Sequence, residues 1–546
     1  MSEKRRLSSP GLAATLIILF FVLDRFLSMG HLLPEFSVED ESWVREGALR
    51  MVKEGSLYPG THKYPQPIFT ATAAAYYAYY LGVNVKALPH FESWESFSHH
   101  RKNFQFPFAT TIMLGRAMVA VIAALALWLF YVFARREFGA LTSLTAMLFL
   151  ATCPAYLFST GMLKNDALLL IGIVLVLFAS VRVFERGELV DYLLAGAAVG
   201  LCLAAKYHVP AVLPVLVAHG LRDRETGFSR SFQGKRWLII FPAAIAVFFI
   251  LSPFTFIDLR NSIEGVGTEL LLQNRLNPLF RRSTENWWQA PVLFQFTSVF
   301  PLALGIPLYL VSLGGFLWKT GIRDRRKLVI WSYPAGFVGF MILTSELGLP
   351  HLYVPAVPFF CLFAAYLFRP WMNSSGLRRG AAVVVVGAIA AYNLVLFHSF
   401  LSIEEHVAKG PAIHMMETHE EGMSDLALVP YRPNPDIEWK MEFAPQFVLS
   451  QKFLENKDPD RILLHETIYH AYLDNPRLRD DPAAGRTVLL YLRMKSGETG
   501  YKEADLWKSV ALKNSVYSSL MPDLRGIRAA IFVKKSDDSG SDDGPD

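Results

Sequence analysis

Long apolar runs separated by short polar connections recur through most of the chain. A bilayer-crossing helix needs about 20 mostly apolar residues, or fewer where it is distorted. The first run follows the basic start MSEKRR and is longer than a signal-peptide core, so we expect it to remain as an anchor. The pattern predicts about eleven spans, at residues 12–27, 112–134, 140–160, 167–184, 190–206, 208–221, 237–254, 291–318, 328–345, 352–368 and 380–400.

The apolar run 67–83 is predicted not to cross. If it crossed, basic clusters such as Arg135-Arg136 and residues 323–327 would face outside. If it only dips in and returns, all of these clusters become cytoplasmic, as the positive-inside rule favours. Tyrosines are also frequent between residues 64 and 80, which suits a membrane interface. We therefore expect a re-entrant or juxtamembrane helix within one long outer loop, 30–111, and a cytoplasmic N-terminus.

The pattern changes near residue 400. Residues 1–400 are predicted to form the transmembrane domain, whereas 401–546 are charged, proline-bearing and mixed in period. The strand-like stretches RTVLLYLRM and RAAIFVKK predict a small α+β domain over 401–535 on the outer face. The acidic tail 536–546 should be disordered. In the outer segment 255–290, the pair Trp287-Trp288 is interpreted as interfacial.

Composition excludes an ordinary soluble protein. The 546 residues are 52% hydrophobic and only 18% charged, which indicates an α-helical polytopic membrane protein with membrane lipids as partners. The net charge of +5 lies in short connections and does not indicate nucleic-acid binding. Three cysteines fall within apolar runs, where we interpret them as small core residues, at Cys153, Cys202 and Cys361.

An acidic cluster follows the first span directly. Glu39, Asp40 and Glu41 begin a segment of helical period that ends at Gly55, and the sequence KYPQP (63–67) comes next. Acids at the water end of a membrane helix are costly unless they are solvated, paired or used on a ligand. They also suit the start of a helix, where negative charge complements the dipole. Three acids beside the KYPQP element favour a functional role.

The order of these parts resembles glycosyltransferase superfamily C, in the branch with protein O-mannosyltransferases and the lipid A aminoarabinose transferase. The resemblance extends over roughly residues 10–400 and rests on the motifs as an ordered set. They are Asp40-Glu41, the helical segment 43–55, KYPQP (63–67), Gly115-Arg116, RREFG (135–139), Pro154, Lys164-Asn165-Asp166, Ala205-Lys206-Tyr207, residues 252–258 and residues 351–358.

The resemblance implies a sugar donor carried on a polyprenyl phosphate and a transfer that inverts the anomeric centre. It also implies a base in the first outer loop, which maps onto Asp40, with Glu41 supporting it or helping to hold a metal. Glu39 leaves the acid register open by one residue. The insertion 87–106 is longer than the family pattern, which leaves the acceptor side open.

Such a transfer needs an acid to take the acceptor proton, and positive charge or a metal on the leaving phosphate. Asp166 is a second candidate acid, although an acid between two spans also suits a helix N-cap. Glu41 and Asp166 facing one cavity would suit Mg²⁺ or Mn²⁺. A histidine ligand, His351 or His62, would favour Zn²⁺, although a lone histidine is more often structural. No organic cofactor is expected.

Three cations lie at outer helix ends. Lys63, Lys206 and Arg116, with Tyr64 beside Lys63, are candidates for binding the donor phosphate through charge-assisted hydrogen bonds. Lysine and arginine at such positions also extend towards lipid headgroups without any catalytic role.

These observations predict an inverting membrane glycosyltransferase that works at the outer leaflet of a prokaryotic inner membrane. Its acceptor would be a lipid, a glycan or a protein. Two other classes remain open: a transporter or flippase of a lipid-linked precursor, and a non-catalytic scaffold whose residues 401–546 bind partners. The absence of an internal repeat and the position of the acids at one membrane face weaken the transporter class.

Overall fold

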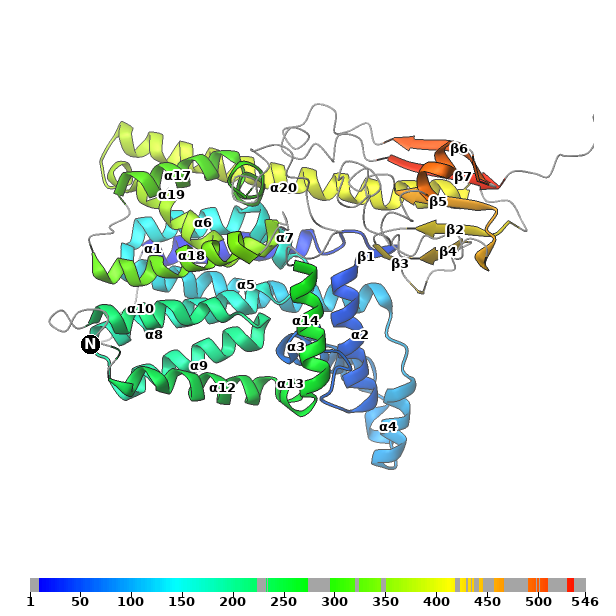
Figure 1. Ribbon diagram of the computed structural model, residues 1–546, viewed down its shortest axis with the longest axis horizontal. Coiled ribbons are helices and arrows are strands. Elements are labelled where there is room, and N and C mark those ends of the chain that lie inside the picture. The colour runs from blue at the N-terminus through cyan, green and yellow to red at the C-terminus, as the bar shows by residue number, and fades with distance from the viewer. Residues whose placement is uncertain are drawn as a thin grey trace, which may run out of the picture. The chain divides into compact units, whose positions relative to one another are not determined.

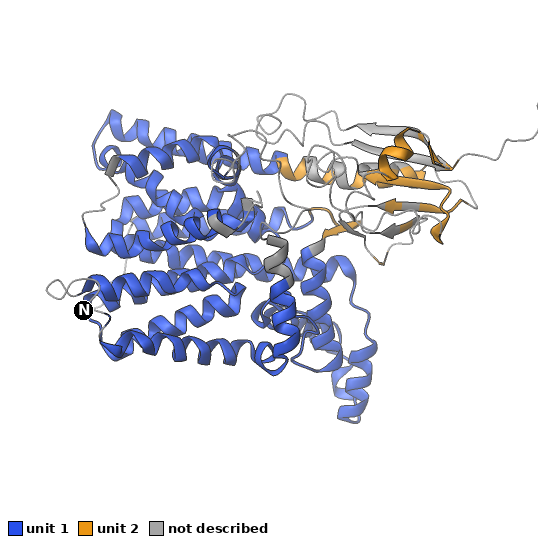
Figure 2. Cartoon of the chain, in the orientation of Figure 1, with its two compact units in different colours: residues 1–30, 40–274, 291–399 blue, residues 31–39, 275–290, 400–546 orange. Residues whose placement is uncertain are grey.

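The computed structural model describes residues 9–222, 232, 234–273, 295–319, 324–344 and 350–417, and after these the segments 423–428, 431–433, 435–436, 441–444, 456–465, 490–496, 498–499, 501–508 and 528–534. The chain divides into two compact units (Figure 2), residues 1–30, 40–274 and 291–399, and residues 31–39, 275–290 and 400–546. The predicted interfacial pair Trp287-Trp288 and the predicted tail lie outside the described residues.

The first unit is built from helices (Figure 1). Up to residue 222 they are α1 (Ser9–Leu27), α2 (Glu39–Glu54), α3 (Gln66–Val83), η1 (Leu88–His90), α4 (Trp94–Asn103), α5 (Phe108–Phe138), α6 (Ala140–Thr152), α7 (Pro154–Thr160), α8 (Asp166–Glu185), α9 (Leu189–Lys206), η2 (Val209–Val212) and α10 (Leu213–Arg222). Beyond it are η3 (Lys235–Ile239), α12 (Ile240–Leu251), α13 (Pro253–Ile257), α14 (Leu259–Gln273), η6 (Gln295–Val299), α16 (Phe300–Leu304), α17 (Ile306–Lys319), α18 (Arg325–Thr344), η7 (Pro350–Tyr353), α19 (Val357–Met372) and α20 (Leu377–Glu417).

Helix α8 lies at the centre of the bundle, in contact with α5, α9, α10 and α18, while α12 packs on the far side of α9. Two glycines four residues apart allow that last contact. A Cβ at Gly196 would lie 2.6 Å from the Ile240 carbonyl oxygen, and one at Gly200 would lie 2.5 Å from the Ala244 carbonyl oxygen. Small residues at this spacing let two membrane helices approach closely.

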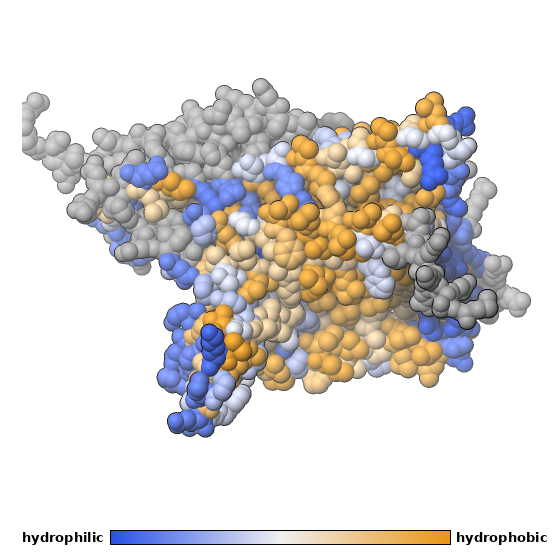
Figure 3. Space-filling view, turned by 180° about the vertical axis from the view of Figure 1, so that it is seen from behind, coloured by the Kyte–Doolittle hydropathy of each residue, from blue (hydrophilic) through white to orange (hydrophobic). Residues whose placement is uncertain are grey.

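Large apolar side chains cover the outside of this bundle. Leu16, Val121, Ile250 and Val384, from four different helices, are each more than half exposed. Figure 3 shows hydrophobic residues over most of the visible bundle and hydrophilic residues towards its ends. An apolar surface of this extent is stable only in contact with lipid. The protein is therefore an integral membrane protein of the polytopic helical class, as the composition predicted.

The predicted count of about eleven spans is not confirmed. Within the described residues, five helices are long and apolar enough to cross a membrane, or up to seven if two bent pairs each count as one span. One bend, of 61°, separates Ala140–Thr152 from Pro154–Thr160, where the proline cannot continue the helix. Several predicted spans correspond to shorter helices, such as Val357–Met372. The described helices are thus shorter or more bent than some of the predicted runs, and the number of spans stays a prediction.

Helix α3 covers the ambiguous run 67–83. It has the length of a span, but it is not among the described helices that are apolar enough to cross, and its juxtamembrane position stays a prediction. The following insertion folds back as η1 and α4 and forms an arm that packs on α3 and projects from the bundle (Figure 1). Tyr80 joins them, with its hydroxyl 2.9 Å from His100 Nδ1 and its ring edge-on to Phe97 and Phe104.

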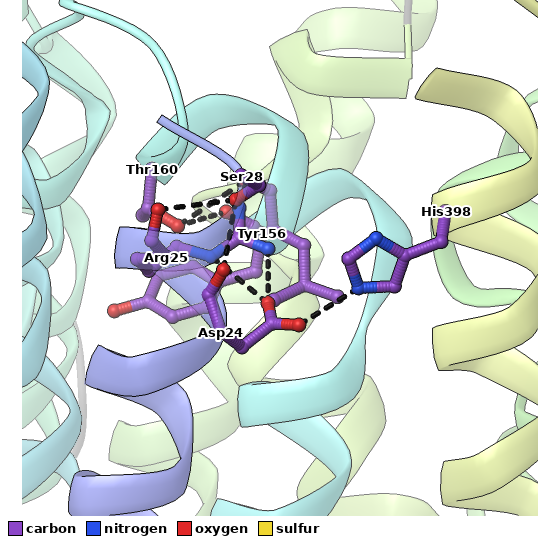
Figure 4. Close-up of polar contacts among 7 residues, drawn as sticks. Asp24, Arg25, Ser28, Tyr156, Thr160 and His398 are labelled. Carbon is purple, nitrogen blue, oxygen red and sulfur yellow. Dashed lines mark hydrogen bonds and ion pairs between the residues drawn. The ribbon is translucent and has the colours of Figure 1, made fainter. Parts of the chain in front are cut away.

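A buried polar cluster ties α1 to α7 and α20 (Figure 4). Asp24 Oδ1 lies 2.8 Å from His398 Nε2, and the other carboxylate oxygen pairs with the Arg25 guanidinium. Arg25 also donates to the Leu157 carbonyl and lies over the Phe397 ring. Buried charges need such partners because the membrane interior provides no water. The cluster fixes the end of the first span in the bundle.

The C-terminal ends of α5 and α8 carry an ionic network. Arg326 Nε lies 2.7 Å from Glu137 and its Nη1 lies 2.6 Å from Glu185, which also pairs with Arg136 at 3.1 Å. Helix α5 has 31 residues, so this network lies roughly 45 Å along the helix from Phe108. Gly139, with φ +90°, makes the turn that closes the RREFG motif there.

The described residues of the second unit form two sheets. Strands β1 (Phe36–Val38) and β3 (Tyr431–Pro433) pair antiparallel. The larger sheet has the order β4-β2-β5-β7-β6, in which β2 is parallel to β4 and β5, and β7 is antiparallel to β5 and β6. Its strands are β2 (Asp425–Leu428), β4 (Met441–Ala444), β5 (Arg461–His465), β6 (Tyr501–Lys508) and β7 (Arg528–Lys534).

One predicted strand of this region is wrong. RAAIFVKK does form β7, but the described part of RTVLLYLRM is helical over 490–495. Leu490, Tyr491 and Met494 are buried there and Leu492 is exposed, which is helical spacing rather than alternation. A short apolar run does not distinguish the two states by its period.

Candidate active site

The charged motifs of the sequence meet at one end of the bundle. Asp40 lies in the first turn of α2, and Lys63 in the connection from α2 to α3. Lys164 and Asp166 belong to the connection that begins α8, and Lys206 is the last residue of α9. These positions come from four separate parts of the chain, so only the packing of the bundle brings their side chains together.

Asp40 lies between two lysines. Its Oδ2 is 3.1 Å from Lys164 Nζ, and its Oδ1 is 3.5 Å from Lys63 Nζ. Burial alone would raise the pKa of the Asp40 carboxyl, but Lys164 and Lys63 hold that pKa well below its usual value. Two ammonium groups from different connections therefore contact the one carboxylate.

Asp166 and Lys206 form a second pair beside the first. Lys206 Nζ lies 2.6 Å from Asp166 Oδ1, and Asp166 is almost completely buried. Asp166 Oδ2 is also buried and, among the described residues, accepts no hydrogen bond. The neighbouring Asn165 donates to the Ala205 carbonyl, which holds the start of α8 against the end of α9. The pair thus presents an anchored ammonium group near the lysines of Asp40.

The structure gives Glu41 and Arg116 different roles from those predicted. Arg116 Nε and Nη2 lie 2.8 and 2.7 Å from the two Glu41 oxygens, and both side chains are buried. The Leu163 amide donates to Glu41 Oε1 at 2.8 Å, and Arg116 Nη1 donates to the Met29 carbonyl at 2.6 Å. With both oxygens on Arg116, Glu41 does not fit the predicted role of metal ligand, whereas its predicted support of the base Asp40 stays a prediction. Arg116 likewise does not fit the predicted phosphate site.

The motif glycine beside Arg116 has a packing reason. A Cβ at Gly115 would lie 2.7 Å from a methyl carbon of Leu163, so a larger residue would push the 161–164 connection away from α5. That connection carries Lys164. The Gly115-Arg116 motif therefore fixes the position of the lysine that pairs with Asp40, through close packing and through Glu41.

Lys63 lies beside two aromatic rings, those of Trp43 and Tyr64. Its Nζ lies 5.4 Å from the centre of the Trp43 ring and 5.8 Å from that of Tyr64, distances at which an ammonium interacts with a ring face. The predicted site residue Tyr64 thus contacts Lys63. Trp43 is on α2, three residues beyond Asp40, so one helix orients both partners of the ion pair.

His62 is held by the region that follows α12. Its Nε2 lies 2.9 Å from Asp258 Oδ2, and its Nδ1 lies 3.0 Å from the Ser262 hydroxyl. The backbone amide of Gln66 donates to the Ser252 hydroxyl at 3.2 Å. The motif at 252–258 therefore holds the KYPQP connection in place through Asp258 and Ser252. His62 is occupied by these contacts and does not fit the predicted metal role.

His351, in η7, borders the same charged group. Its ring stacks on Phe158, whose own ring lies 5.6 Å from Lys164 Nζ. Burial, and next to it the charges of Lys164 and Lys206, lower the pKa of His351 well below its usual value. His351 is therefore neutral at pH 7 and can exchange hydrogen bonds with a ligand that carries hydroxyl groups.

The residues present do not fit a metal ion as predicted. Glu41 is used by Arg116, and Asp166 offers one oxygen beside an ammonium group. Within the described part of the chain, no three His, Cys, Asp or Glu side chains lie close enough together to hold an ion. A Zn²⁺ site needs three or four such ligands, and the predicted set of Glu41, Asp166 and His351 does not form such a group. The positive charges beside Asp40 and Asp166 are instead those of Lys63, Lys164 and Lys206.

The sequence named Lys164 within a motif but did not identify it as a site residue. Its signal was weak because a lysine at a helix end usually serves the membrane interface. The structure shows it to be mostly buried and paired with an acid distant in sequence, Asp40. A lysine buried in this way needs a partner, but which one cannot be known before the fold.

Comparison with known proteins is consistent with these motifs. A family model described as dolichyl-phosphate-mannose-protein mannosyltransferase matches residues 108–256, a segment with Arg116, Lys164, Asp166 and Lys206 but without Asp40. A search of curated proteins found no match.

Several solved structures resemble the chain. ArnT from Cupriavidus metallidurans bound to undecaprenyl phosphate has 14% identity and a TM-score of 0.48, over 85% of this chain and 95% of that one. The Archaeoglobus fulgidus oligosaccharyltransferase complexed with Zn and sulfate has 11% identity and a TM-score of 0.47, over 96% and 88%. The S. cerevisiae protein O-mannosyltransferase complex bound to the sugar donor has 16% identity and a TM-score of 0.33, over 51% and 37%.

The family match includes Lys164, Asp166 and Lys206 of the charged residues that meet at the end of the bundle, and the predicted membrane class is confirmed. The chain thus resembles glycosyltransferase superfamily C, as the order of its sequence motifs predicted.

Proposed function

We propose that the protein is an inverting glycosyltransferase that moves a sugar from a polyprenyl-phosphate donor to an acceptor hydroxyl at the outer leaflet. The observation that carries this proposal is the Asp40 carboxylate between Lys63 and Lys164. The carboxylate suits removal of the proton from the acceptor hydroxyl, and the two ammonium groups suit stabilisation of the leaving phosphate.

In the proposed step, Asp40 accepts the proton of the acceptor hydroxyl while that oxygen bonds to the anomeric carbon. The bond from that carbon to the phosphate oxygen breaks on the opposite face, and polyprenyl phosphate leaves. Lys164 and Lys63 stabilise the charge that develops on the phosphate, with Lys206 as a third cation held by Asp166. Neutral His351 is available to contact sugar hydroxyls.

The lowered pKa of Asp40 suits this sequence of events. In the free protein, both lysines stabilise the carboxylate. A bound phosphate would compete for the same ammonium groups, so the pKa of Asp40 would rise as the donor binds. Asp40 would then become a stronger base at the stage when a proton must be removed. Donor binding and base activation are thus coupled through Lys164 and Lys63.

The ionic network at the far end of α5 supports the proposed orientation. Arg136 and Arg326 lie there, roughly 45 Å from the start of α5. Basic residues in short loops favour the cytoplasmic face. If that face is cytoplasmic, Asp40 lies at the outer leaflet. We propose that the membrane is a prokaryotic inner membrane. The acceptor would be a lipid, a glycan or a protein reached from that side.

The direct test is transfer of radiolabelled sugar from a panel of polyprenyl-phosphate donors by the purified full-length protein. Product formation with release of polyprenyl phosphate is the expected result. If a well-folded protein transfers nothing from any donor, the enzyme proposal fails. Movement of labelled lipid-linked precursor across proteoliposomes would in that case favour the transporter class.

Chelation is expected to leave transfer unchanged. Lysines rather than clustered carboxylates lie around the proposed phosphate position, so no metal is needed to neutralise it. The measurement is the transfer rate after prolonged dialysis against EDTA and after addition of Mg²⁺, Mn²⁺ or Zn²⁺. A large loss that one of these ions restores would contradict the assignment to lysines and return the site to the metal prediction.

Lys164→Gln is expected to move the acid limb of the kcat/KM profile to higher pH. Asp40 acts as a carboxylate, and Lys164 is the largest of the influences that lower its pKa. Removing that charge raises the pKa, so protonation begins at a higher pH. The same pair adds stability above the ordinary pKa of 3.8 and loses it as pH falls through the lowered value. Lys86→Gln, an exposed lysine away from the site, is the control; an unchanged acid limb in Lys164→Gln would refute the coupling.

A further inference from the structure

A cavity of about 500 Å³ lies in the arm, between the end of α2 and the helix α4. The side chains that line it include five charged ones and one tryptophan: Lys53, Glu54, Glu95, Arg101, Lys102 and Trp94. In Figure 3 the arm projects beside the apolar bundle and is mostly hydrophilic. None of these residues belongs to the charged group around Asp40.

Arg101 is the unusual member of this cavity. It is only 8% exposed, yet it makes no hydrogen bond or ion pair with any other residue that the structure describes, and its Nε is buried without a partner. Burying a guanidinium without partners is costly. Its place in the last turn of α4 suits the helix dipole, but that effect accounts for a cation there and not for its burial.

The guanidinium is held in place by packing. Arg101 lies 5.9 Å from the ring centres of both Trp94 and Phe97. On another side it meets the backbone at Gly55, where a Cβ would lie 2.5 Å from Arg101 Nη2. Gly55 has φ +67°, which glycine adopts without strain as it ends α2. A fixed guanidinium that faces a cavity is prepared to bind a ligand.

The neighbours of Arg101 indicate what that ligand is. A guanidinium binds carboxylate or phosphate through two parallel hydrogen bonds, and Lys53 and Lys102 add positive charge. Trp94 is 71% exposed at the same cavity and can stack on a sugar ring. Attraction to an anionic membrane surface needs a cluster of about four to eight Lys or Arg. Here three cations face two acids, which favours one discrete anion over a lipid surface.

We propose that this cavity is a subsite for an acidic sugar, one that carries a carboxylate or a phosphate, within an extended glycan acceptor. Asp40 and Lys53 are at opposite ends of α2, roughly 20 Å apart along the helix axis. The bound sugar would therefore lie several units away from the acceptor hydroxyl. The proposal rests on the proposed function and adds to it the class of acceptor and the role of the insertion 87–106.

The test measures binding separately from transfer. Purified full-length protein in phosphatidylcholine nanodiscs is titrated with trigalacturonic acid and with neutral galactotriose, by isothermal calorimetry. The wild type is expected to bind the acidic trisaccharide and not the neutral one. Arg101→Gln should weaken that binding by about tenfold or more, the usual effect of losing a charged hydrogen-bond partner. Lys102→Gln, an exposed position that leaves the packing intact, should weaken it less, and Lys86→Gln should not change it.

Several outcomes overturn the subsite. They are equal binding of both trisaccharides, undiminished binding by Arg101→Gln and Lys102→Gln, or Arg101-dependent binding of short-chain phosphatidylglycerol with none of the acidic trisaccharide. If Arg101→Gln does not fold, Lys102→Gln decides by itself. Sugar transfer that depends on Asp40 but shows no preference for acidic acceptors refutes the subsite and leaves the proposed function intact. Arg101-dependent trisaccharide binding without any transfer supports the subsite and refutes the enzyme proposal.

Discussion

Asp40→Asn should reduce sugar transfer by about 10²- to 10⁴-fold, the usual contribution of a positioned general base. Asparagine keeps the size of the side chain but cannot accept the acceptor proton. Its neutral amide also leaves Lys63 and Lys164 without the carboxylate that they share in the wild type. Donor binding should therefore be kept or strengthened while turnover falls. The measurement is kcat and the KM for the donor, by radiolabelled transfer.

The matched control is Glu46→Gln, which removes an exposed acid from the same helix, six residues beyond Asp40. It should leave both constants near their wild-type values. If Asp40→Asn retains transfer within a few-fold of the wild type, Asp40 is not the base. If it mainly raises the KM for the donor, the carboxylate contributes to binding and not to proton transfer. The neighbouring acid Glu39, whose register the sequence left open, would then be tested next.

Arg116→Met should destabilise the protein by about 3–5 kcal/mol, the usual cost of removing one partner from a buried ion pair. The substitution leaves the Glu41 carboxylate buried without the guanidinium that contacts both of its oxygens. It also leaves the Met29 carbonyl without a donor. The change in stability is measured by denaturation of the purified protein in detergent, followed by circular dichroism of its helices.

The double variant Glu41→Leu with Arg116→Met is the informative comparison. Since no charge is left buried, it should be more stable than Arg116→Met alone, although the Leu163 amide loses its acceptor. A strong coupling energy between the two substitutions supports the structural role. If Arg116→Met is as stable as the wild type and loses donor affinity instead, then Arg116 binds the donor phosphate as the sequence predicted.

Tertiary structure also decides which acid is available for chemistry. Asp40 and Glu41 are adjacent, and both are acids in the first turn of one helix. The helical rotation of about 100° per residue turns them to different neighbours. Glu41 meets Arg116, 75 residues away, and Asp40 meets Lys164. The sequence identifies both residues as acids at the start of a helix. Their pKa values and their roles depend on which distant charge packs against each of them.

The sequence by itself determined the class of this protein. Its apolar runs, the short basic connections and the ordered motifs from Asp40-Glu41 to Ala205-Lys206-Tyr207 were enough to predict a polytopic membrane protein resembling glycosyltransferase superfamily C. These properties can be predicted because spans and motifs each depend on residues that are close together in the sequence. The acids and lysines that meet at one end of the bundle had almost all been named.

The tertiary structure alone decided how these parts work together. It paired Glu41 with Arg116, brought Lys164 to Asp40, bent the third predicted span at Pro154, and buried Arg101 against Gly55. Each of these outcomes depends on contacts between segments that no local pattern relates. A buried charge takes the partner that packing supplies, so its role is known only when the helices that surround it have been placed.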